Sequence, residues 1–424
     1  MLFHEMNTTR RTPNPRWRAT MLAAGLVAAP LAFAQLAVEA EKLYPMTGDL
    51  KPIDAGVVLC SAEGKIEKVG KAADIKVPAG YKRLQAIVAM PGIIDAHATV
   101  GLSGILNSDK HDQEQLEKSA PIQPELRAVD AYNGRDPLVR WVRELGITTV
   151  HTGHAPGALV AGQTMILKTD VASITKAEDT IRPFAMVAAT LGKGGLAEGD
   201  GKAPGTRAKS VAMLRENLLK AQAYQKKLAE KDAEKQPDRD LRLEALVAVL
   251  RKEVPLLVTA HRHHDLAAAL RLQEEFGFKL VLDGASEAYF LLEEIKKAGV
   301  PILVHPTMAR PFGEHENMTF TLAAKLHGAK IPFAFQSGYE GYVPKTRVVH
   351  FEAALAVAYG LPYEAALAAC TSGAAELLGI ADRVGALKPG LDADLALFDG
   401  DPLETTTHCT GVVIGGKVVS SQTR

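Results

Sequence analysis

The chain has 424 residues, 47% of them hydrophobic, and its 49 Lys+Arg balance 49 Asp+Glu to a formal net charge of +0. So much apolar surface can form a large buried core, which excludes disorder as the main state of the chain. The balanced charge excludes the broad basic surface that binds nucleic acid or anionic lipid, so we expect a small-molecule substrate as the partner and leave a homo-oligomer open.

The N-terminal residues have the layout of a signal peptide. Arginines within residues 10–18 precede an uncharged run over residues 19–34, which ends in the small-x-small pattern Ala32-Phe33-Ala34. This run is shorter than the ~20 residues that usually span a bilayer. We therefore predict cleavage before Gln35, export to the periplasm or secretion, and no membrane association once the leader is removed. The pattern leaves open whether the Sec or the twin-arginine route is used.

Both ends of the remaining chain are rich in short strands, and no similar pattern occurs between them. Each predicted strand is short and is bounded by glycine or polar turn residues. These strands fall within residues 56–69, 84–90, 394–398 and 411–419. We therefore predict one small β-sandwich domain that is assembled from residues 35–90 and 383–424.

The three cysteines do not form a Cys-x-x-Cys motif for a metal or for redox chemistry. Cys370 lies in an apolar helical stretch, where a small core residue is expected. Cys60 and Cys409 fall in the two segments of the predicted small domain. Because an exported protein meets an oxidising environment, a disulfide between these two cysteines stays open.

Between the two ends, apolar runs alternate with helical stretches, which is the pattern of parallel β/α units. The apolar runs lie at residues 256–260, 279–282, 301–304 and 331–335, with helical stretches at 265–276, 286–298 and 319–328. No glycine-rich dinucleotide turn follows the first strand, which favours one closed barrel over an open sheet. The predicted fold is therefore α/β, with a (β/α)₈ TIM-type barrel over residues 91–382 and the small domain beside it.

Polar residues terminate the predicted strands, and the carboxyl ends of parallel barrel strands meet at one mouth. Burying a polar side chain costs desolvation free energy, and a residue that only caps a strand would not recover it. The set therefore favours a functional site. The strand ends are His97, His151, His261, Asp283, His305 and Gln336.

The loops after these strands add three further candidates. His154 lies in a glycine-rich turn, and we predict that it binds substrate together with His305 and Gln336. Arg310 could bind a substrate carboxylate as a bidentate pair, and Tyr339 could donate to a carbonyl oxygen.

Two terminal motifs resemble those of the amidohydrolase superfamily. Residues 90–97, MPGIIDAH, resemble its first-strand motif Pro-Gly-x-Ile-Asp-x-His-x-His, and residues 384–395, VGALKPGLDADL, are similar to its return into the β-domain. Residues 146–150 are similar to its second strand. The pattern looks closest to the imidazolonepropionase-like branch. The resemblance implies a metal-dependent hydrolase that acts on carbon–nitrogen bonds other than standard peptide bonds.

The resemblance also implies one or two divalent metals, held by two first-strand histidines, a fourth-strand Lys or Glu, two further histidines and an eighth-strand Asp. Those metals acidify the attacking water. His97 and His261 match two of the ligands. The other expected positions differ: Thr99 replaces the second first-strand His, Asp283 or Gly284 stands at the sixth strand, Gly338 replaces the eighth-strand Asp, and Lys168 is the nearest candidate on the fourth strand.

These departures predict a degenerate metal site. We expect one divalent ion rather than two, with zinc favoured, held by His97 and His261 and completed by Asp283 or His305. Asp283 is the predicted catalytic carboxylate. Two functions stay open: hydrolysis of a small amide, cyclic amide or dipeptide-like substrate by metal-activated water, or a catalytically silent barrel without metal that binds a small ligand or a protein partner.

Overall fold

The computed structural model describes residues 35–105, 110–197, 199, 201–232, 234, 236–339 and 349–424. The predicted signal peptide, residues 1–34, lies outside the described residues. Within the described ranges, no helix combines the length and the apolar character that a membrane crossing requires.

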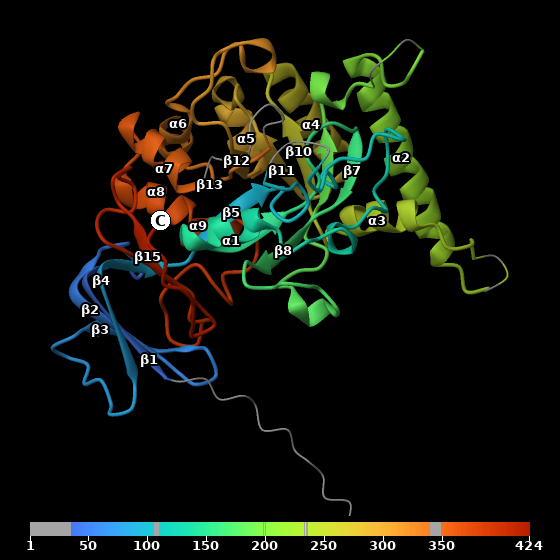
Figure 1. The fold of residues 1–424 in the computed structure, drawn as a ribbon. Coiled ribbons are helices and arrows are strands. Elements are labelled where there is room, and N and C mark those ends of the chain that lie inside the picture. Colours follow the sequence, from blue (N-terminus) through green and yellow to red (C-terminus); the bar gives the residue numbers. More distant parts are fainter. Residues whose placement is uncertain are drawn as a thin grey trace, which may run out of the picture. The chain divides into compact units, whose positions relative to one another are not determined.

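Strands from both ends of the chain form one seven-stranded sheet, drawn in blue and red in Figure 1. The order across this sheet is β16-β15-β14-β4-β1-β2-β3. Strand β4 joins the two halves, because it pairs in parallel with β1 and antiparallel with β14. The structure therefore has one sheet where we predicted a two-layer sandwich. Its strands are β1 (Leu36–Leu43), β2 (Ile53–Cys60), β3 (Ile66–Lys71), β4 (Lys82–Pro91), β14 (Leu395–Phe398), β15 (Cys409–Ile414) and β16 (Lys417–Ser420).

The cysteines of this sheet are not joined. Cys60 in β2 and Cys409 in β15 are buried free thiols, and strands β14, β4 and β1 lie between them in the sheet. Burial raises the pKa of the Cys60 thiol to about 12 and that of the Cys409 thiol to about 11. The disulfide that the sequence left open is therefore absent. Cys370 is a third buried free thiol, as expected of a core residue.

The larger part of the chain has two further sheets. One has the order β5-β6-β8 and the other β13-β12-β11-β10-β9-β7, and the strands from β9 to β13 are parallel. A parallel bridge between Ala98 and Gly338 connects the end of β5 to the chain after β13. The strands are β5 (Ile93–Ala98), β6 (Ile147–Thr152), β7 (Val160–Gln163), β8 (Met165–Lys168), β9 (Val187–Thr190), β10 (Leu256–Ala260), β11 (Leu280–Gly284), β12 (Ile302–Val304) and β13 (Phe333–Phe335).

The closed barrel that we predicted is not present as a continuous ladder in the described residues. Strand β8 pairs antiparallel with β6, and β7 pairs antiparallel with β9, so parallel pairing stops between β6 and β9. The fold is a mixed α/β fold in which β5 and β9 to β13 supply the parallel strands that position the site.

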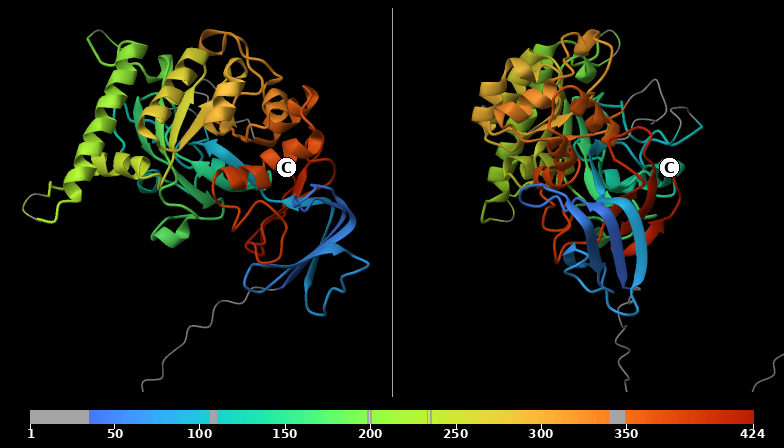
Figure 2. Two further views of the ribbon diagram at one scale, coloured as in Figure 1. Left: turned by 180° about the vertical axis from the view of Figure 1, so that it is seen from behind. Right: turned by 90° about the vertical axis from the view of Figure 1, so that its left-hand side faces the viewer.

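Helices follow the parallel strands in the predicted alternation. Seen from behind, the yellow and orange helices of residues 263–329 cover the outer side of the strands (Figure 2). The helix α4 ends at Gly277, whose φ of 71° is the left-handed conformation that commonly closes a helix. The helices are α1 (Pro137–Glu144), α2 (Arg207–Leu228), α3 (Leu241–Leu250), α4 (His263–Phe276), α5 (Leu292–Ala298), α6 (Leu322–Ala329), α7 (Val349–Ala358), α8 (Tyr363–Ala369) and α9 (Ser372–Leu377).

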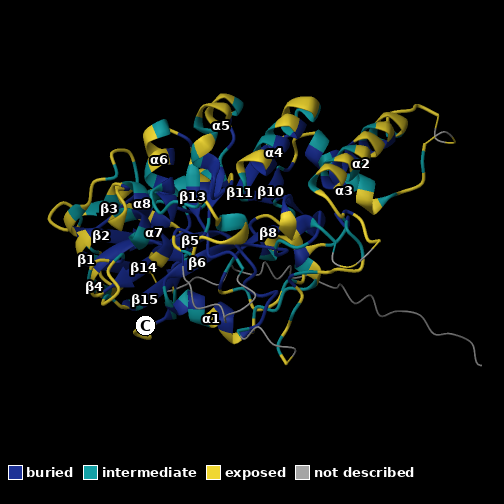
Figure 3. Cartoon of the chain, turned by 90° about the horizontal axis from the view of Figure 1, so that it is seen from above, coloured by how far each residue is buried: buried dark blue, intermediate teal, exposed yellow. Residues whose placement is uncertain are grey.

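The core lies on both faces of the parallel strands. Every residue of β10 and β11 is buried, as expected where both faces of a sheet are covered. Figure 3 shows these strands in dark blue, and the exposed turns of helices such as α4 and α5 face away from them. Successive residues of β10 pack in different hydrophobic clusters, with Val258 in one cluster and Leu257 in the other. This packing holds the carboxyl ends of β10 and β11 side by side.

Lys168, at the end of β8, is part of a buried ion cluster. Its Nζ lies 2.8 Å from Oδ2 of Asp392 and 3.0 Å from Oδ1 of Asp394. Burial by itself would lower the pKa of Lys168, but the two carboxylates outweigh burial and raise it. Lys168 therefore ties β8 to the segment that returns to the seven-stranded sheet, and it is not the fourth-strand metal ligand that we considered.

Candidate active site

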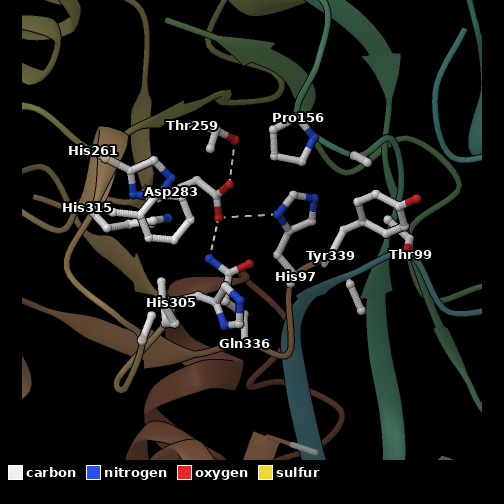
Figure 4. Close-up of a pocket in the computed structure, with 17 residues that line it drawn as sticks. His97, Thr99, Pro156, Thr259, His261, Asp283, His305, His315, Gln336 and Tyr339 are labelled. Carbon is white, nitrogen blue, oxygen red and sulfur yellow. Dashed lines mark hydrogen bonds and ion pairs between the residues drawn. The ribbon is translucent and has the colours of Figure 1, made fainter. Parts of the chain in front are cut away.

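A cavity of about 260 Å³ lies at the carboxyl ends of β5, β10 and β11 and in the loops after β12 and β13. Six of the eight site residues that we predicted from the sequence line it (Figure 4). Much of the remaining wall is small or apolar, including Ala155, Pro156 and Pro306. The six are His97, His261, Asp283, His305, Gln336 and Tyr339.

Asp283 is held by three protein donors. Its Oδ2 accepts a hydrogen bond of 2.5 Å from Thr259 Oγ1, and its Oδ1 lies 3.2 Å from Nδ1 of His97. The Nε2 group of Gln336 also donates to Oδ1, and it reaches the carbonyl oxygen of Leu303 at 3.0 Å. Both carboxylate oxygens therefore have partners from neighbouring strands, which fixes the orientation of the carboxylate.

These donors keep Asp283 ionised. Burial opposes ionisation of the carboxyl group, but His97, Thr259 and Gln336 together outweigh burial and lower the pKa of Asp283 to about 2. At neutral pH the carboxylate can only accept hydrogen bonds, so Nδ1 of His97 must carry the proton that it shares with Asp283. When the imidazole is neutral, its other ring nitrogen, Nε2, presents a lone pair.

Nε2 of His97 is buried and has no hydrogen-bond partner among the residues that the structure describes. A buried polar atom without a partner costs free energy unless a ligand or a water molecule satisfies it. Because His97 lines the cavity, this nitrogen is suited to accept a proton from a molecule bound there.

A second histidine pair lies on the other side of Asp283. Nδ1 of His261 is 3.0 Å from Oγ of Ser286, and the same Oγ is 2.9 Å from Nδ1 of His315. The rings of His261 and His315 pack edge to face, with centroids 4.1 Å apart. Burial, and after it the neighbouring His315, lowers the pKa of His261 to about 3, so His261 is neutral at neutral pH.

Two glycines stand where the superfamily resemblance led us to look for metal ligands. Gly284 and Gly338 have φ values of 78° and 60°, which side chains rarely adopt. A Cβ on Gly284 would lie 2.4 Å from Cε1 of His261, and one on Gly338 would lie 2.6 Å from Cδ2 of His305. The imidazoles of His261 and His305 therefore occupy the space that a sixth-strand and an eighth-strand side chain would need.

His305 is positioned by a buried carboxylate of α7. Oε2 of Glu352 accepts hydrogen bonds from the backbone N of Thr307 at 2.7 Å and from its Oγ1 at 2.6 Å. The other oxygen of Glu352, Oε1, lies 3.8 Å from Nδ1 of His305. Helix α7 thus fixes the loop that follows β12.

Three predicted polar residues do not line the cavity. Both ring nitrogens of His151 are hydrogen-bonded inside the fold. Nδ1 lies 2.6 Å from the carbonyl oxygen of Ala96, and Nε2 lies 2.7 Å from Oγ1 of Thr164. His154 is buried next to the cavity, with its ring against Gly162 of β7. Arg310 is exposed and lies outside the lining, so its predicted contact with a substrate carboxylate stays a prediction.

The divalent metal that the resemblance implies requires several ligands aimed at one point. Figure 4 shows Asp283 between the rings of His97 and His261, and both of its oxygens are taken by protein donors. In the part of the chain that the structure describes, no group of three or more His, Cys, Asp or Glu side chains is placed to hold a metal ion. The predicted ligand set therefore does not fit a metal in this arrangement.

Several residues in or beside the cavity were missed by reading strand ends. Thr259 stands two residues before His261, and alternation along a strand could have placed both on one face. Ser286 lies outside the lining, at the start of the stretch 286–298 that we predicted as helical, and His315 lies in the loop after β12. Phe312, on the same loop as His315, is 72% exposed at the rim of the cavity.

The profile of the amidohydrolase family matches residues 342–420. Amidohydrolase tasK of Hapsidospora irregularis is 26% identical over 388 residues, which cover 80% of this chain and 37% of tasK. The chain thus spans little more than a third of the length of that relative.

Solved structures extend this similarity over most of the chain. A crystal structure of an amidohydrolase from Thermotoga maritima MSB8 matches with a TM-score of 0.82 and 27% identity, covering 91% of this chain and 100% of its own. An adenosine deaminase from Xanthomonas campestris with bound zinc has a TM-score of 0.53 and 17% identity, covering 92% and 93%. The second similarity is one of fold alone.

Proposed function

Because the chain belongs to the amidohydrolase superfamily, we propose that it hydrolyses carbon–nitrogen bonds in small amides or cyclic amides. The observation that carries this proposal is the buried pair of His97 and Asp283 at the wall of the cavity. An ionised carboxylate that fixes one imidazole nitrogen leaves the other as a base, the arrangement that general base catalysis requires.

In the proposed reaction, Nε2 of His97 takes a proton from a water molecule as the water oxygen attacks the carbonyl carbon. Asp283 stabilises the imidazolium that forms, because it accepts the hydrogen bond from Nδ1 throughout the step. Tyr339, whose Oη accepts a hydrogen bond of 3.1 Å from Gln115 Nε2, is the proposed donor to the carbonyl oxygen. The leaving nitrogen must then receive a proton from a second group.

The lining favours an uncharged substrate. Of the cavity residues that the structure describes, none is Lys or Arg, and the carboxylate of Asp283 is already paired. A dipeptide-like substrate with a free carboxylate would lack a cation in this lining. An amide or cyclic amide of about the size of the cavity, with an apolar substituent beside Phe312, suits it better.

Metal-activated water, which the resemblance implies for this superfamily, needs ligands that His97, His261 and Asp283 do not present to one point. The proposed mechanism therefore takes no step through a metal. We retain the proposal of export, which rests on the sequence of residues 1–34, and intact-mass analysis of exported protein should find a chain that begins at Gln35.

The second candidate function is binding without turnover. The three donors that saturate Asp283 favour it, because a carboxylate that is so fully engaged can serve a purely structural purpose. The two functions predict different results when purified protein is incubated with a panel of uncharged amides and lactams and the released amine is measured. Release by the wild type and its loss in Asp283→Asn support the hydrolase, whereas saturable binding without release supports the ligand-binding protein.

A further inference from the structure

Ser286 links two histidines that both line the cavity, and the proposed hydrolysis leaves this linkage unused. Its Oγ lies 3.0 Å from Nδ1 of His261 and 2.9 Å from Nδ1 of His315. A serine hydroxyl has one proton to donate and can accept as well, so it donates to one imidazole and accepts from the other. The three groups therefore form one continuous chain of hydrogen bonds with a direction.

We propose that His261, Ser286 and His315 form a proton relay that delivers a proton to the leaving nitrogen of the substrate. This inference rests on the proposed hydrolysis and supplies the second group that it requires. His261 is the inner end of the relay, because its Nδ1 faces Ser286 and its Nε2 is the nitrogen left for a substrate. His315 is the outer end, since it lies in the loop of the exposed rim residue Phe312.

The proton balance follows from the directions of these hydrogen bonds. The relay requires that His315 enter the step protonated on both nitrogens, so that it donates from Nδ1 to Ser286, which donates to Nδ1 of His261. As the carbon–nitrogen bond breaks, Nε2 of His261 gives its proton to the leaving nitrogen, and each hydrogen bond of the relay passes one proton inward, which leaves His315 neutral. After the product has left, Nε2 of His261 takes a proton from solvent and the protons pass back along the same hydrogen bonds to His315, while His97 releases the proton that it took from water.

Ser286 is unsuited to act as a nucleophile in this arrangement. Its side chain is buried, it is not part of the cavity lining, and both imidazoles already engage its oxygen. The loop that carries His315 is held in place from outside the relay. Glu314, the preceding residue, accepts a hydrogen bond of 3.0 Å from the backbone N of Lys193 and pairs with Nη2 of Arg207 at 2.9 Å. The outer end of the relay is therefore anchored to α2 and to the loop after β9.

The relay is tested by how strongly the effect of each variant on kcat depends on the leaving group of the substrate. A poor leaving group such as an amine needs a proton, whereas p-nitrophenolate does not. The experiment compares hydrolysis of an alkylamide and of the p-nitrophenyl ester of the same acid by the wild type, Ser286→Ala and His315→Gln. Both variants should lower kcat on the amide by about 10²-fold and change kcat on the ester by less than about threefold. His408→Gln, which changes an exposed histidine of the seven-stranded sheet, should leave both unchanged.

The outcomes separate the relay from the proposed function. An equal loss on both substrates, or no loss on either, would overturn the relay and leave the hydrolase intact. A wild type that releases no amine from any amide would overturn the proposed function itself. The hydrogen-bond chain is tested without turnover by imidazole ¹⁵N spectra of wild type and Ser286→Ala: the Nδ1 resonances of His261 and His315 should both shift, and a spectrum in which neither shifts contradicts the relay.

Discussion

Nδ1 of His97 lies 3.2 Å from Oδ1 of Asp283, and the two side chains are only 4% and 3% exposed. The pair joins the carboxyl end of β5 to that of β11, which are 186 positions apart in the chain. A carboxylate and an imidazole brought together from such distant segments, with one ring nitrogen left without a partner, indicate a site in which the histidine acts on a bound molecule.

Asp283→Asn should lower kcat for amide hydrolysis by about 10²-fold or more, because an amide neither holds the required tautomer of His97 nor stabilises its imidazolium. His97→Gln should cause a similar loss, and the double variant should lose little more than either single variant, since the two residues act as one unit. Steady-state kinetics measures all three.

The matched control is a second Asp–His pair outside the cavity. Asp399 and His408 are 3.1 Å apart on the exposed loop between β14 and β15, and Asp399→Asn should leave kcat unchanged. Losses in the single variants that add in the double variant would indicate separate, indirect effects.

Stability should rise with pH between about 4 and 6.5. Burial lowers the pKa of His350 and His154 to about 4, and burial is also the largest cause that lowers the pKa of His151 to about 3, from an ordinary value of 6.5. In this interval the unfolded chain binds more protons than the folded one, so the free energy of unfolding increases with pH and is fully developed above about 6.5. Urea unfolding at a series of pH values measures the slope.

His350 offers a direct check, because Nδ1 of its buried ring has no hydrogen-bond partner in the described part of the chain. His350→Asn should reduce the proton uptake on unfolding near pH 5 by about one. The exposed His408→Gln serves as the control and should leave the slope as it is. A free energy of unfolding that falls as the pH rises from 4.5 to 6.5 would show that these histidines are charged in the folded protein.

Gly338→Ala should destabilise the protein more than Gly299→Ala. Both glycines have similar left-handed φ values, 60° and 64°, so each substitution carries a similar backbone cost of roughly 1 kcal/mol. Only at Gly338 would the new Cβ overlap His305, since nothing lies within 4 Å of a Cβ on Gly299. Thermal and urea unfolding compare the two variants, and equal losses would show that the ring of His305 moves aside at no cost.

Lys168→Met should cost about 3–5 kcal/mol, because it leaves the buried carboxylate of Asp394 without its cation, whereas Asp392 keeps Lys65 and Arg383. The side chain of Lys168 is 13% exposed, whereas that of Lys51, which pairs with Asp49, is 78% exposed. Lys51→Met should therefore cost less than about 1 kcal/mol. Urea unfolding gives both values. A small loss in Lys168→Met would mean that the cluster is not needed to hold the two segments together.

Much of the site could be predicted because strand ends are visible in a sequence. His97, Asp283 and Gln336 follow apolar runs, and parallel strands bring their carboxyl ends to one rim. His151 also ends a strand, but its ring is hydrogen-bonded inside the fold, with Nε2 on Thr164, which immediately precedes the antiparallel partner β8. The chemistry of the strand ends was therefore easier to predict than the direction in which each side chain points.

The loop residues could not be predicted from periodicity. Ser286 and His315 come together because the loops after β11 and β12 meet, and a loop carries no pattern that fixes its path. The hydrogen bonds of Asp283 could not be predicted for a related reason: the sequence places His261 and Asp283 at one rim but does not show that Thr259 and Gln336 donate to the carboxylate.

Whether His97 and Asp283 activate the attacking water without a metal is tested by amide hydrolysis before and after complete chelation, with the metal content of the same samples measured. The wild type should retain its rate when the metal content falls well below one ion per chain, and Asp283→Asn should be inactive in both states. A rate that disappears on chelation and returns with added Zn²⁺, Mn²⁺ or Co²⁺ would show instead that a metal activates the water.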